Sequence, residues 1–199
     1  MGSMPSGAGQ TLQQVWIVRH GETAWSLSGQ HTGRTNIPLL ASGGQAAQAL
    51  QPRLESRPFA KVLSSPLARA RQTCELAGFA DVAENCDDLV EWDYGSYEGR
   101  RTADILVERP GWKLFEDGCP GGETLAEVAA RADRVIASLR KVNGDALLFA
   151  HRDILRVIAA RWVEFPAIEA RRLYLNTASI SVLGYDHNPG EPIIRSLNT

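Results

Sequence analysis

Long apolar runs are missing from this sequence, and so is any regular spacing of disulfide-forming or metal-binding residues. No stretch approaches the ~18 apolar residues that a membrane-spanning helix needs. The first ten residues are small and polar and lack the apolar core of a secretory signal, so the cytoplasm is the expected compartment. The odd number and irregular spacing of Cys74, Cys86 and Cys119 argue against a disulfide framework. Without Cys-x-x-Cys or His-x-x-x-His pairs, no metal site is expected.

An excess of charge of one sign is also missing. The chain carries 21 basic and 23 acidic residues, a net charge of −2, so no general positive field would attract nucleic acid or an anionic membrane. Its 199 residues, 44% hydrophobic and 22% charged, are typical of one globular domain and exclude a disordered chain, a collagen or a coiled-coil rod. Met1–Ser3 precedes a second methionine, as a tag scar would. We therefore predict a flexible leader, residues 1–13, that includes this scar, and one domain over residues 14–199.

Short segments rich in β-branched residues alternate with segments of helical periodicity. The strongest helix pattern is Glu123–Lys141, where apolar residues recur every three or four positions. Gly21–Gly44 is predicted as one long loop, and Val82–Val90 is ambiguous. The alternation predicts an α/β domain with a largely parallel sheet, whose site lies at the carboxyl ends of the strands. The expected strands are Val15–Val18, Lys61–Ser64, Ala146–Phe149, Ile180–Tyr185 and Ile193–Leu197, and the other expected helices are Ala46–Leu54, Leu67–Ala77, Thr102–Glu108 and Ile154–Val163.

Two of the expected strands run directly into a histidine. One leads into Arg19-His20-Gly21-Glu22, and another leads through Ala150 into His151. A charged arginine at the end of a buried strand is costly unless it meets an anion. Gly21 lets the backbone turn tightly and lets a ligand approach closely. A less specific interpretation stays open, in which the arginine pairs with a structural carboxylate and the histidines are packed in the core.

Two further segments offer groups suited to phosphate. Arg69 lies in the first turn of a helix, where free N–H groups, the helix dipole and a planar guanidinium all favour an anion. Glu91 follows an extended segment, and a carboxyl group close to a phosphate has a raised pKa and can act as a general acid. Taken alone, Glu91 would be interpreted as a surface acid. Three other basic residues are predicted to lie on the surface: His31, Arg71 and His187.

Together these segments supply two arginines, two histidines and one acid, without metal ligands. Phosphoryl transfer depends above all on charge neutralisation and in-line positioning. A neutral imidazole can attack phosphorus and hold it covalently, and neighbouring guanidinium groups keep that imidazole unprotonated. The set therefore predicts phosphoryl transfer without a metal or another cofactor.

Taken in their order along the chain, these motifs resemble those of the histidine phosphatase superfamily, in its phosphoglycerate mutase-like branch. The resemblance implies a single-domain, three-layer α/β/α sandwich with a mostly parallel central sheet. It covers Val15 to about Trp162, and the segments that carry it are Arg19–Thr23, Thr32-Gly33, Ser65–Thr73, Leu89–Gly99 and Gly121–Thr124.

The resemblance also implies roles for individual residues. His20 would be the phosphorylated nucleophile and Glu91 the proton donor, with His151 as the third catalytic residue. Phosphate would be bound by Arg19, Arg69 and Ser26, the last standing where the mutases usually carry an asparagine. The expected substrate contacts are Thr32, Gly33, Tyr94 and Arg152.

The chain departs from the family's pattern after the second histidine, where glycine is usual. Here Arg152 would either crowd the pocket or supply a third cation for a second anionic group. Asp153 would bring a negative charge to an anion site unless it pairs with Arg152 or lies in the first turn of the next helix. A basic pair, Arg100-Arg101, could hold a second anionic group or simply begin a solvated helix.

The expected function is hydrolysis of phosphomonoesters through a phosphohistidine, because the segment between Gly99 and Glu123 is too short for a large mutase lid. The expected substrates are small phosphorylated metabolites, above all sugar phosphates, since the loops resemble those of fungal sedoheptulose bisphosphatases and small bacterial broad-specificity acid phosphatases. Two alternatives stay open: mutase-type phosphoryl transfer, and a weakly active relative that binds phosphorylated ligands or a protein. The sequence also leaves open a homodimer through Val163–Pro166 and the late strands.

Overall fold

The computed structural model describes residues 12–199, in which six strands form one sheet. In the sheet order, the strands are β3 (Glu84–Asn85), β2 (Phe59–Ser64), β4 (Asp145–Ala150), β1 (Val15–Arg19), β5 (Ile180–Tyr185) and β6 (Pro192–Ser196). Parallel pairing joins β1 to β4, β4 to β2 and β2 to β3, whereas β5 pairs antiparallel with β1, and β6 with β5. Of the predicted leader only residues 12 and 13 are described, and the predicted tag scar lies outside the described residues.

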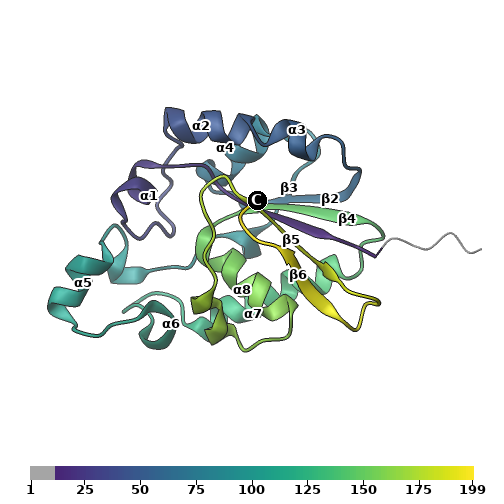
Figure 1. The fold of residues 1–199 in the computed structure, drawn as a ribbon. Coiled ribbons are helices and arrows are strands. Elements are labelled where there is room, and N and C mark those ends of the chain that lie inside the picture. The colour runs from purple at the N-terminus through teal and green to yellow at the C-terminus, as the bar shows by residue number, and fades with distance from the viewer. Residues whose placement is uncertain (1–11) are drawn as a thin grey trace, which may run out of the picture.

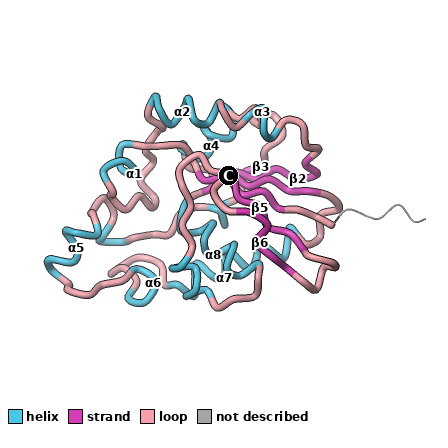
Figure 2. Tube along the Cα trace, in the orientation of Figure 1, coloured by secondary structure: helices cyan, strands magenta, loops and turns pink. Residues whose placement is uncertain are grey.

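Helices cover both faces of the sheet, which confirms the predicted sandwich (Figure 1). One face carries α2 (Ala41–Gln48), α3 (Gln51–Leu54) and α4 (Ala68–Leu76), and the other carries α7 (Leu125–Leu139) and α8 (Arg152–Trp162). Beyond the carboxyl edge of the sheet lie α1 (Ala24–Ser28), α5 (Thr102–Glu108) and α6 (Leu114–Asp117), joined by long loops (Figure 2). The remaining short helices are η1 (Asp87–Leu89), η2 (Gly95–Tyr97) and η3 (Ala167–Arg172).

The central strand β4 is buried on both faces, as parallel strands between two helix layers are. Leu147 and Phe149 pack in the core beneath α3 and α4, whereas Leu148 and its neighbours pack against α7 and α8. The apolar stripe predicted for α7 is the face that it buries. Thr124 begins this helix with a capping box to Glu127.

Two of the predicted elements are wrong in extent. The predicted helix Ala46–Leu54 is instead two helices, because Pro52 has no N–H to continue α2 and lies in the first turn of α3. The predicted loop Gly21–Gly44 contains α1 and the first half of α2. The ambiguous segment Val82–Val90 contributes only the two-residue edge strand β3 and η1. In contrast, α5 and β5 have the predicted bounds.

Two glycines hold the backbone after β1 against α2. A Cβ on Gly43 would lie 2.2 Å from the main-chain oxygen of Glu22, and one on Gly21 would lie 2.4 Å from the main-chain oxygen of Gly43. Gly44, the next residue in α2, offers ordinary contact, since its Cβ would lie 3.6 Å from Leu76 Cδ1. The close approach therefore belongs to Gly21 and Gly43 and determines the path of the chain that follows His20.

Adjacent substitutions in α2 are expected to change stability in opposite directions. Gly43→Ala should lower the free energy of unfolding by at least about 1 kcal/mol, because the backbone clash outweighs the gain in helix propensity. Gly44→Ala should raise it by up to about 0.8 kcal/mol, because only the propensity term acts. Urea denaturation followed by circular dichroism measures both values. Equal changes of the same sign in the two free energies of unfolding would show that the close approach of Gly43 to Glu22 does not destabilise Gly43→Ala.

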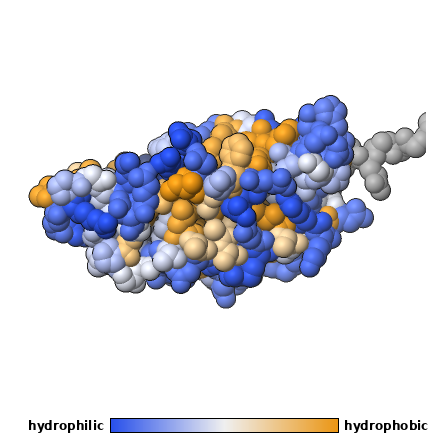
Figure 3. Space-filling view, turned by 90° about the horizontal axis from the view of Figure 1, so that it is seen from below, coloured by the Kyte–Doolittle hydropathy of each residue, from blue (hydrophilic) through white to orange (hydrophobic). Residues whose placement is uncertain are grey.

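The molecular surface mixes polar and apolar residues, as seen from below in Figure 3. Within residues 12–199, no helix is long and apolar enough to cross a membrane. Phe165, in the segment predicted as a dimer surface, is 57% exposed, and a homodimer through that surface stays a prediction.

Candidate active site

The parallel pairing of β1 and β4 brings the two histidines together. Arg19 lies opposite Ala150 in the register, so both strands end at the same level of the sheet edge. The next residues are His20 and His151, whose ring centroids lie 5.3 Å apart. The main-chain N–H of His20 donates to the Ala150 oxygen at 2.9 Å. Residues more than a hundred positions apart in the sequence therefore form one site.

His20 is buried and its ring is held in one tautomer. Its Nδ1 lies 2.7 Å from the main-chain oxygen of Gly21. Because a carbonyl oxygen only accepts, Nδ1 carries the proton and Nε2 keeps its lone pair. Burial, together with the charges of Arg19 and Arg69, lowers the pKa of His20 well below its usual range. The imidazole is therefore neutral and has a free ring nitrogen.

Two buried guanidinium groups lie at this site without a carboxylate partner among residues 12–199. Arg19 donates from Nη1 to the Leu175 oxygen at 2.6 Å, and burial, with the charge of Arg152, lowers its pKa to about 10. Arg69 donates to carbonyl oxygens of the loop that holds Thr32 and Gly33. The Nε atoms of Arg19 and Arg69 are buried and have no partner in the described chain. The alternative of an arginine paired with a structural carboxylate is therefore not found, and such groups favour an anion.

His151 is fully buried behind His20. Its Nε2 lies 2.7 Å from Ser65 Oγ, and its Nδ1 has no partner among the described residues. Burial and the charge of Arg69 lower the pKa of His151 well below its usual range. This second imidazole is therefore neutral as well.

Glu91 is buried at the start of α8. Its carboxylate accepts main-chain N–H bonds from Trp92, Asp153 and Ile154 at 2.9 to 3.2 Å. Burial, and next the negative charge of Asp153, raises the pKa of Glu91, although the N–H bonds act in the opposite direction. A carboxyl group with a raised pKa can carry a proton close to neutral pH and deliver it to a leaving group.

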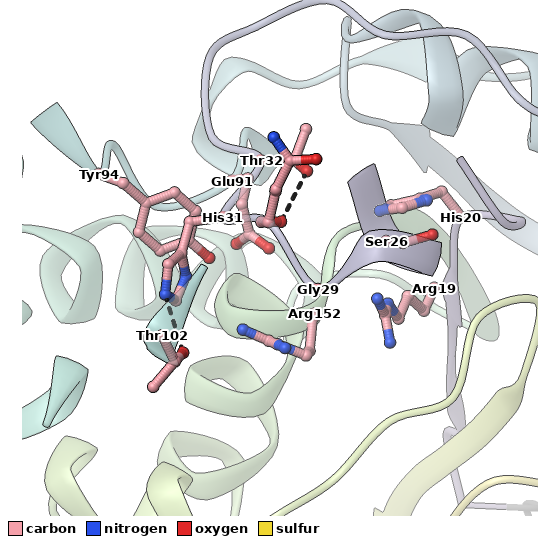
Figure 4. A pocket seen from close by; sticks show the side chains of 11 residues that line it. Arg19, His20, Ser26, Gly29, His31, Thr32, Glu91, Tyr94, Thr102 and Arg152 are labelled. Carbon is pink, nitrogen blue, oxygen red and sulfur yellow. Dashed lines mark hydrogen bonds between the residues drawn. The ribbon is translucent and has the colours of Figure 1, made fainter. Parts of the chain in front are cut away.

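A cavity of about 470 Å³, counting its open mouth, lies in front of His20 (Figure 4). Three of the predicted site residues do not line the cavity: Gly33, Arg69 and His151. Gly33 and His151 lie behind its walls, and Arg69 holds the adjoining loop through a hydrogen bond to the Thr32 oxygen. The predicted site residues that do line it are Arg19, His20, Ser26, Thr32, Glu91, Tyr94 and Arg152. The other lining residues, which the sequence analysis did not assign to the site, are Gly29, Gln30, His31 and Thr102.

The prediction that His31 is a surface residue is wrong. It is only 6% exposed, because Tyr94 and Trp112 pack on its ring with centroids 4.8 and 5.5 Å away. His31 Nε2 lies 3.2 Å from Thr102 Oγ1, and the two residues face the cavity together (Figure 4). The signal was available in the sequence, since His31 directly precedes the predicted substrate residues Thr32 and Gly33.

Ser26 and Gly33 also have structural contacts of their own. The Ser26 hydroxyl accepts from the Thr23 N–H at 2.8 Å and closes the capping box of α1. Gly33 N–H donates to the Glu98 carboxylate, and a Cβ on Gly33 would lie 2.5 Å from Glu98 Oε2. Gly33 thus allows the loop to pass close to Glu98, so that Thr32 reaches the cavity.

The unusual pair after His151 is joined by a salt bridge. Asp153 lies in the first turn of α8, as predicted, and its carboxylate binds the Arg152 guanidinium through Nε at 3.1 Å. In the other basic pair, Arg100 binds Glu108 and Arg101 binds Asp104, and neither lines the cavity.

The predicted surface residues Arg71 and His187 are exposed. Within residues 12–199, the one cluster of three side chains that could ligate a metal lies on the exposed turn between β5 and β6, outside the cavity. It consists of Asp186, His187 and Glu191.

The fold and the cavity define an α/β protein in which two neutral imidazoles, two buried guanidiniums and one acid lie in and around one cavity. The model of the histidine phosphatase superfamily (branch 1) matches residues 15–199. The chain therefore belongs to this superfamily, and it is a phosphatase of the histidine phosphatase type.

Curated relatives and solved structures agree with this assignment. An acid phosphatase of Mycobacterium tuberculosis is 40% identical over 180 residues, which cover 87% of this chain and 87% of that protein. Sedoheptulose 1,7-bisphosphatase of Saccharomyces cerevisiae is 36% identical over 181 residues, which cover 73% of this chain and 66% of that protein. The solved structure of an open reading frame product from Mycobacterium tuberculosis superposes with a TM-score of 0.88 at 37% identity, covering 94% of this chain and 97% of that one.

Proposed function

We propose that this phosphatase hydrolyses small phosphomonoesters, sugar phosphates above all, through a phosphohistidine at His20 and without a metal ion. One observation carries the proposal: the His20 ring is anchored through Nδ1 on the Gly21 oxygen, with its free Nε2 in the cavity that Arg19 also lines. A nucleophile, a cation and an acid are then present around one phosphate-sized volume, which is what phosphoryl transfer requires.

In the first step, His20 Nε2 attacks phosphorus and forms a P–N bond while the P–O bond to the alcohol breaks. Glu91 gives its proton to the departing oxygen, so the alcohol leaves neutral. Arg19 and Arg69 supply positive charge for the phosphoryl oxygens, and the neutral His151 packs against the ring of His20. In the second step, water attacks phosphorus while the P–N bond breaks and its electron pair returns to His20 Nε2; the Glu91 carboxylate takes the proton of that water, and inorganic phosphate is released.

The lining of the cavity supports a small polar substrate. Hydroxyl and amide groups of Ser26, Gln30, Thr32 and Thr102 can bond sugar hydroxyls. The segment between Gly99 and Glu123 forms only α5, α6 and their loops, which supports water rather than a sequestered hydroxyl as the acceptor. The name of the yeast relative, a sugar bisphosphatase, supports the same substrate class.

A panel of sugar phosphates, 3-phosphoglycerate and p-nitrophenyl phosphate, assayed with an excess of EDTA, tests this function. We expect phosphate release that EDTA leaves unchanged, because the cavity supplies its positive charge from arginines. Phosphate release is measured colorimetrically, and isomerisation of 3-phosphoglycerate is followed in parallel. Fast isomerisation with negligible phosphate release would establish the mutase alternative, and phosphate binding without turnover would establish the ligand-binding alternative.

A further inference from the structure

Arg152 points along the cavity and away from His20 (Figure 4). Its guanidinium extends toward His31 and Tyr94, whereas Arg19 and His20 lie at the other end of the cavity. We call the side chains around this second end the distal end, which comprises His31, Thr102 and Arg152 (Figure 4).

Hydrogen bonds to Asp153 hold the guanidinium of Arg152 in place. Asp153, which is completely buried, accepts from Arg152 Nε and Nη2 at 3.1 Å each. The same carboxylate accepts from the Tyr94 hydroxyl at 2.6 Å and from Arg156 Nη1 at 2.7 Å. Burial alone would raise the pKa of Asp153, but the charges of Arg152 and Arg156 hold it well below its usual range. Asp153 therefore stays ionised and fixes the orientation of Arg152.

The charges within these salt bridges do not cancel, because one carboxylate, Asp153, faces two guanidiniums, those of Arg152 and Arg156. The other carboxyl group near Arg152 is Glu91, whose pKa is raised and which carries a proton at the start of the proposed first step. Among the described residues, Arg152 Nη1 makes no hydrogen bond, and the side chain is one-third exposed, toward the cavity. The distal end therefore presents an oriented cation with free N–H donors, beside the Thr102 hydroxyl and the neutral ring of His31.

The charge of Arg152 is itself stabilised, since Asp153 raises the pKa of Arg152 above its usual range, but this charge adds to the positive charge of the cavity. Arg152 shares a small cavity with Arg19, and its charge helps to lower the pKa of Arg19, of His20 and of His31, which falls to about 4. Such repulsion between fixed charges is relieved when a negative group binds between or beside them. Arg100 and Arg101, the other candidates near this end, are already neutralised by Glu108 and Asp104.

We propose that the distal end binds a second anionic group of the substrate, and that Arg152, positioned by Asp153, makes the enzyme prefer metabolites with a phosphate or carboxylate opposite the reacting phosphate. This inference rests on the proposed function, which puts the reacting phosphate at His20. The guanidinium suits both anions, because its planar N–H groups match the spacing of phosphate and carboxylate oxygens.

Binding to a variant that cannot turn over tests the inference apart from catalysis. Calorimetry on His20→Ala compares fructose 1,6-bisphosphate with fructose 6-phosphate, and 3-phosphoglycerate with glycerol 3-phosphate. We expect the second anion to tighten Kd at least tenfold in both pairs. Adding Arg152→Met, which keeps the length but removes the charge, should reduce this preference to below threefold. Adding Arg101→Met, a nearby arginine outside the cavity, should leave the preference unchanged.

Three results would overturn the inference. The first is equal Kd values for the two ligands of each pair in His20→Ala. The second is an equal loss of affinity for both ligands of a pair when Arg152→Met is added, and the third is loss of the preference for the second anion when Arg101→Met is added. If only one pair responds, the second group is phosphate alone or carboxylate alone. Should Arg152→Met fail to fold, Arg152→Gln, which can still donate to Asp153, replaces it. A wild-type enzyme that hydrolyses no ester would refute the proposed function, while these Kd ratios would still decide the distal end.

Discussion

Replacing His20 with alanine is expected to reduce kcat for p-nitrophenyl phosphate by at least about 10⁴-fold, because the proposed nucleophile is lost and His31, the other imidazole that lines the cavity, lies at its opposite end (Figure 4). His151, the nearest imidazole, lies behind His20 with its Nε2 on Ser65 and does not line the cavity. Rapid acid-free quenching with ³²P-labelled substrate should trap label on the wild-type protein that is lost in acid and retained in base, as phosphohistidine is.

The matched control is His187→Ala. His187 is exposed on the turn between β5 and β6, so its loss should leave both turnover and labelling unchanged. Thermal melting checks that His20→Ala remains folded. Residual activity of His20→Ala above one-tenth of wild type, or label on another residue, would contradict the assignment of the nucleophile.

Replacing Glu91 with glutamine is expected to slow hydrolysis of alkyl phosphates by about 10²- to 10⁴-fold, because an amide cannot deliver the proton that the alcohol needs. The fold should tolerate the change, since the main-chain N–H groups of Trp92 and Ile154 bond Oε1, whose place the amide oxygen can take, and the Asp153 N–H, which both oxygens share, keeps its bond to that oxygen. With p-nitrophenyl phosphate, whose phenolate leaves without a proton, formation of the phosphohistidine should persist. Its hydrolysis should be slowed, because glutamine cannot take the proton of the attacking water. A burst of p-nitrophenol equal to the enzyme concentration, measured by stopped flow, would report the trapped phosphoenzyme.

The pH dependence of the wild-type enzyme follows from the same residue. Because the pKa of Glu91 is raised, its protonated form extends toward neutral pH, and kcat/KM for alkyl phosphates should fall as the pH rises through that pKa. Because the pKa of His20 is lowered, the nucleophile stays neutral on the acid side. The optimum should therefore lie on the acid side of neutrality. Glu91→Gln should lose the alkaline decline, and a decline that persists unchanged would assign the acid to another group.

Much of the fold could be read from the sequence because its signals are local. The β-branched segments of β1 and β4, and the three- and four-residue periodicity of α7, each report burial of a single element. The start of α2 at Ala41 was missed because this helix tolerates Gly43, a poor helix former, for the sake of its contact with Glu22. That contact joins segments that no local pattern connects.

The sequence by itself determined which chemical groups this protein can use: His20 and His151 at two strand ends, Arg19 beside the first, and the acid Glu91. Those assignments are local, since a short motif carries both the residue type and its position on a strand. Only the tertiary structure decided which ring nitrogen of His20 is free, that His31 is buried at the cavity, and that Asp153 turns Arg152 into an oriented cation. Each of these depends on contacts between distant segments and on the low dielectric of a buried site, which a linear pattern does not encode.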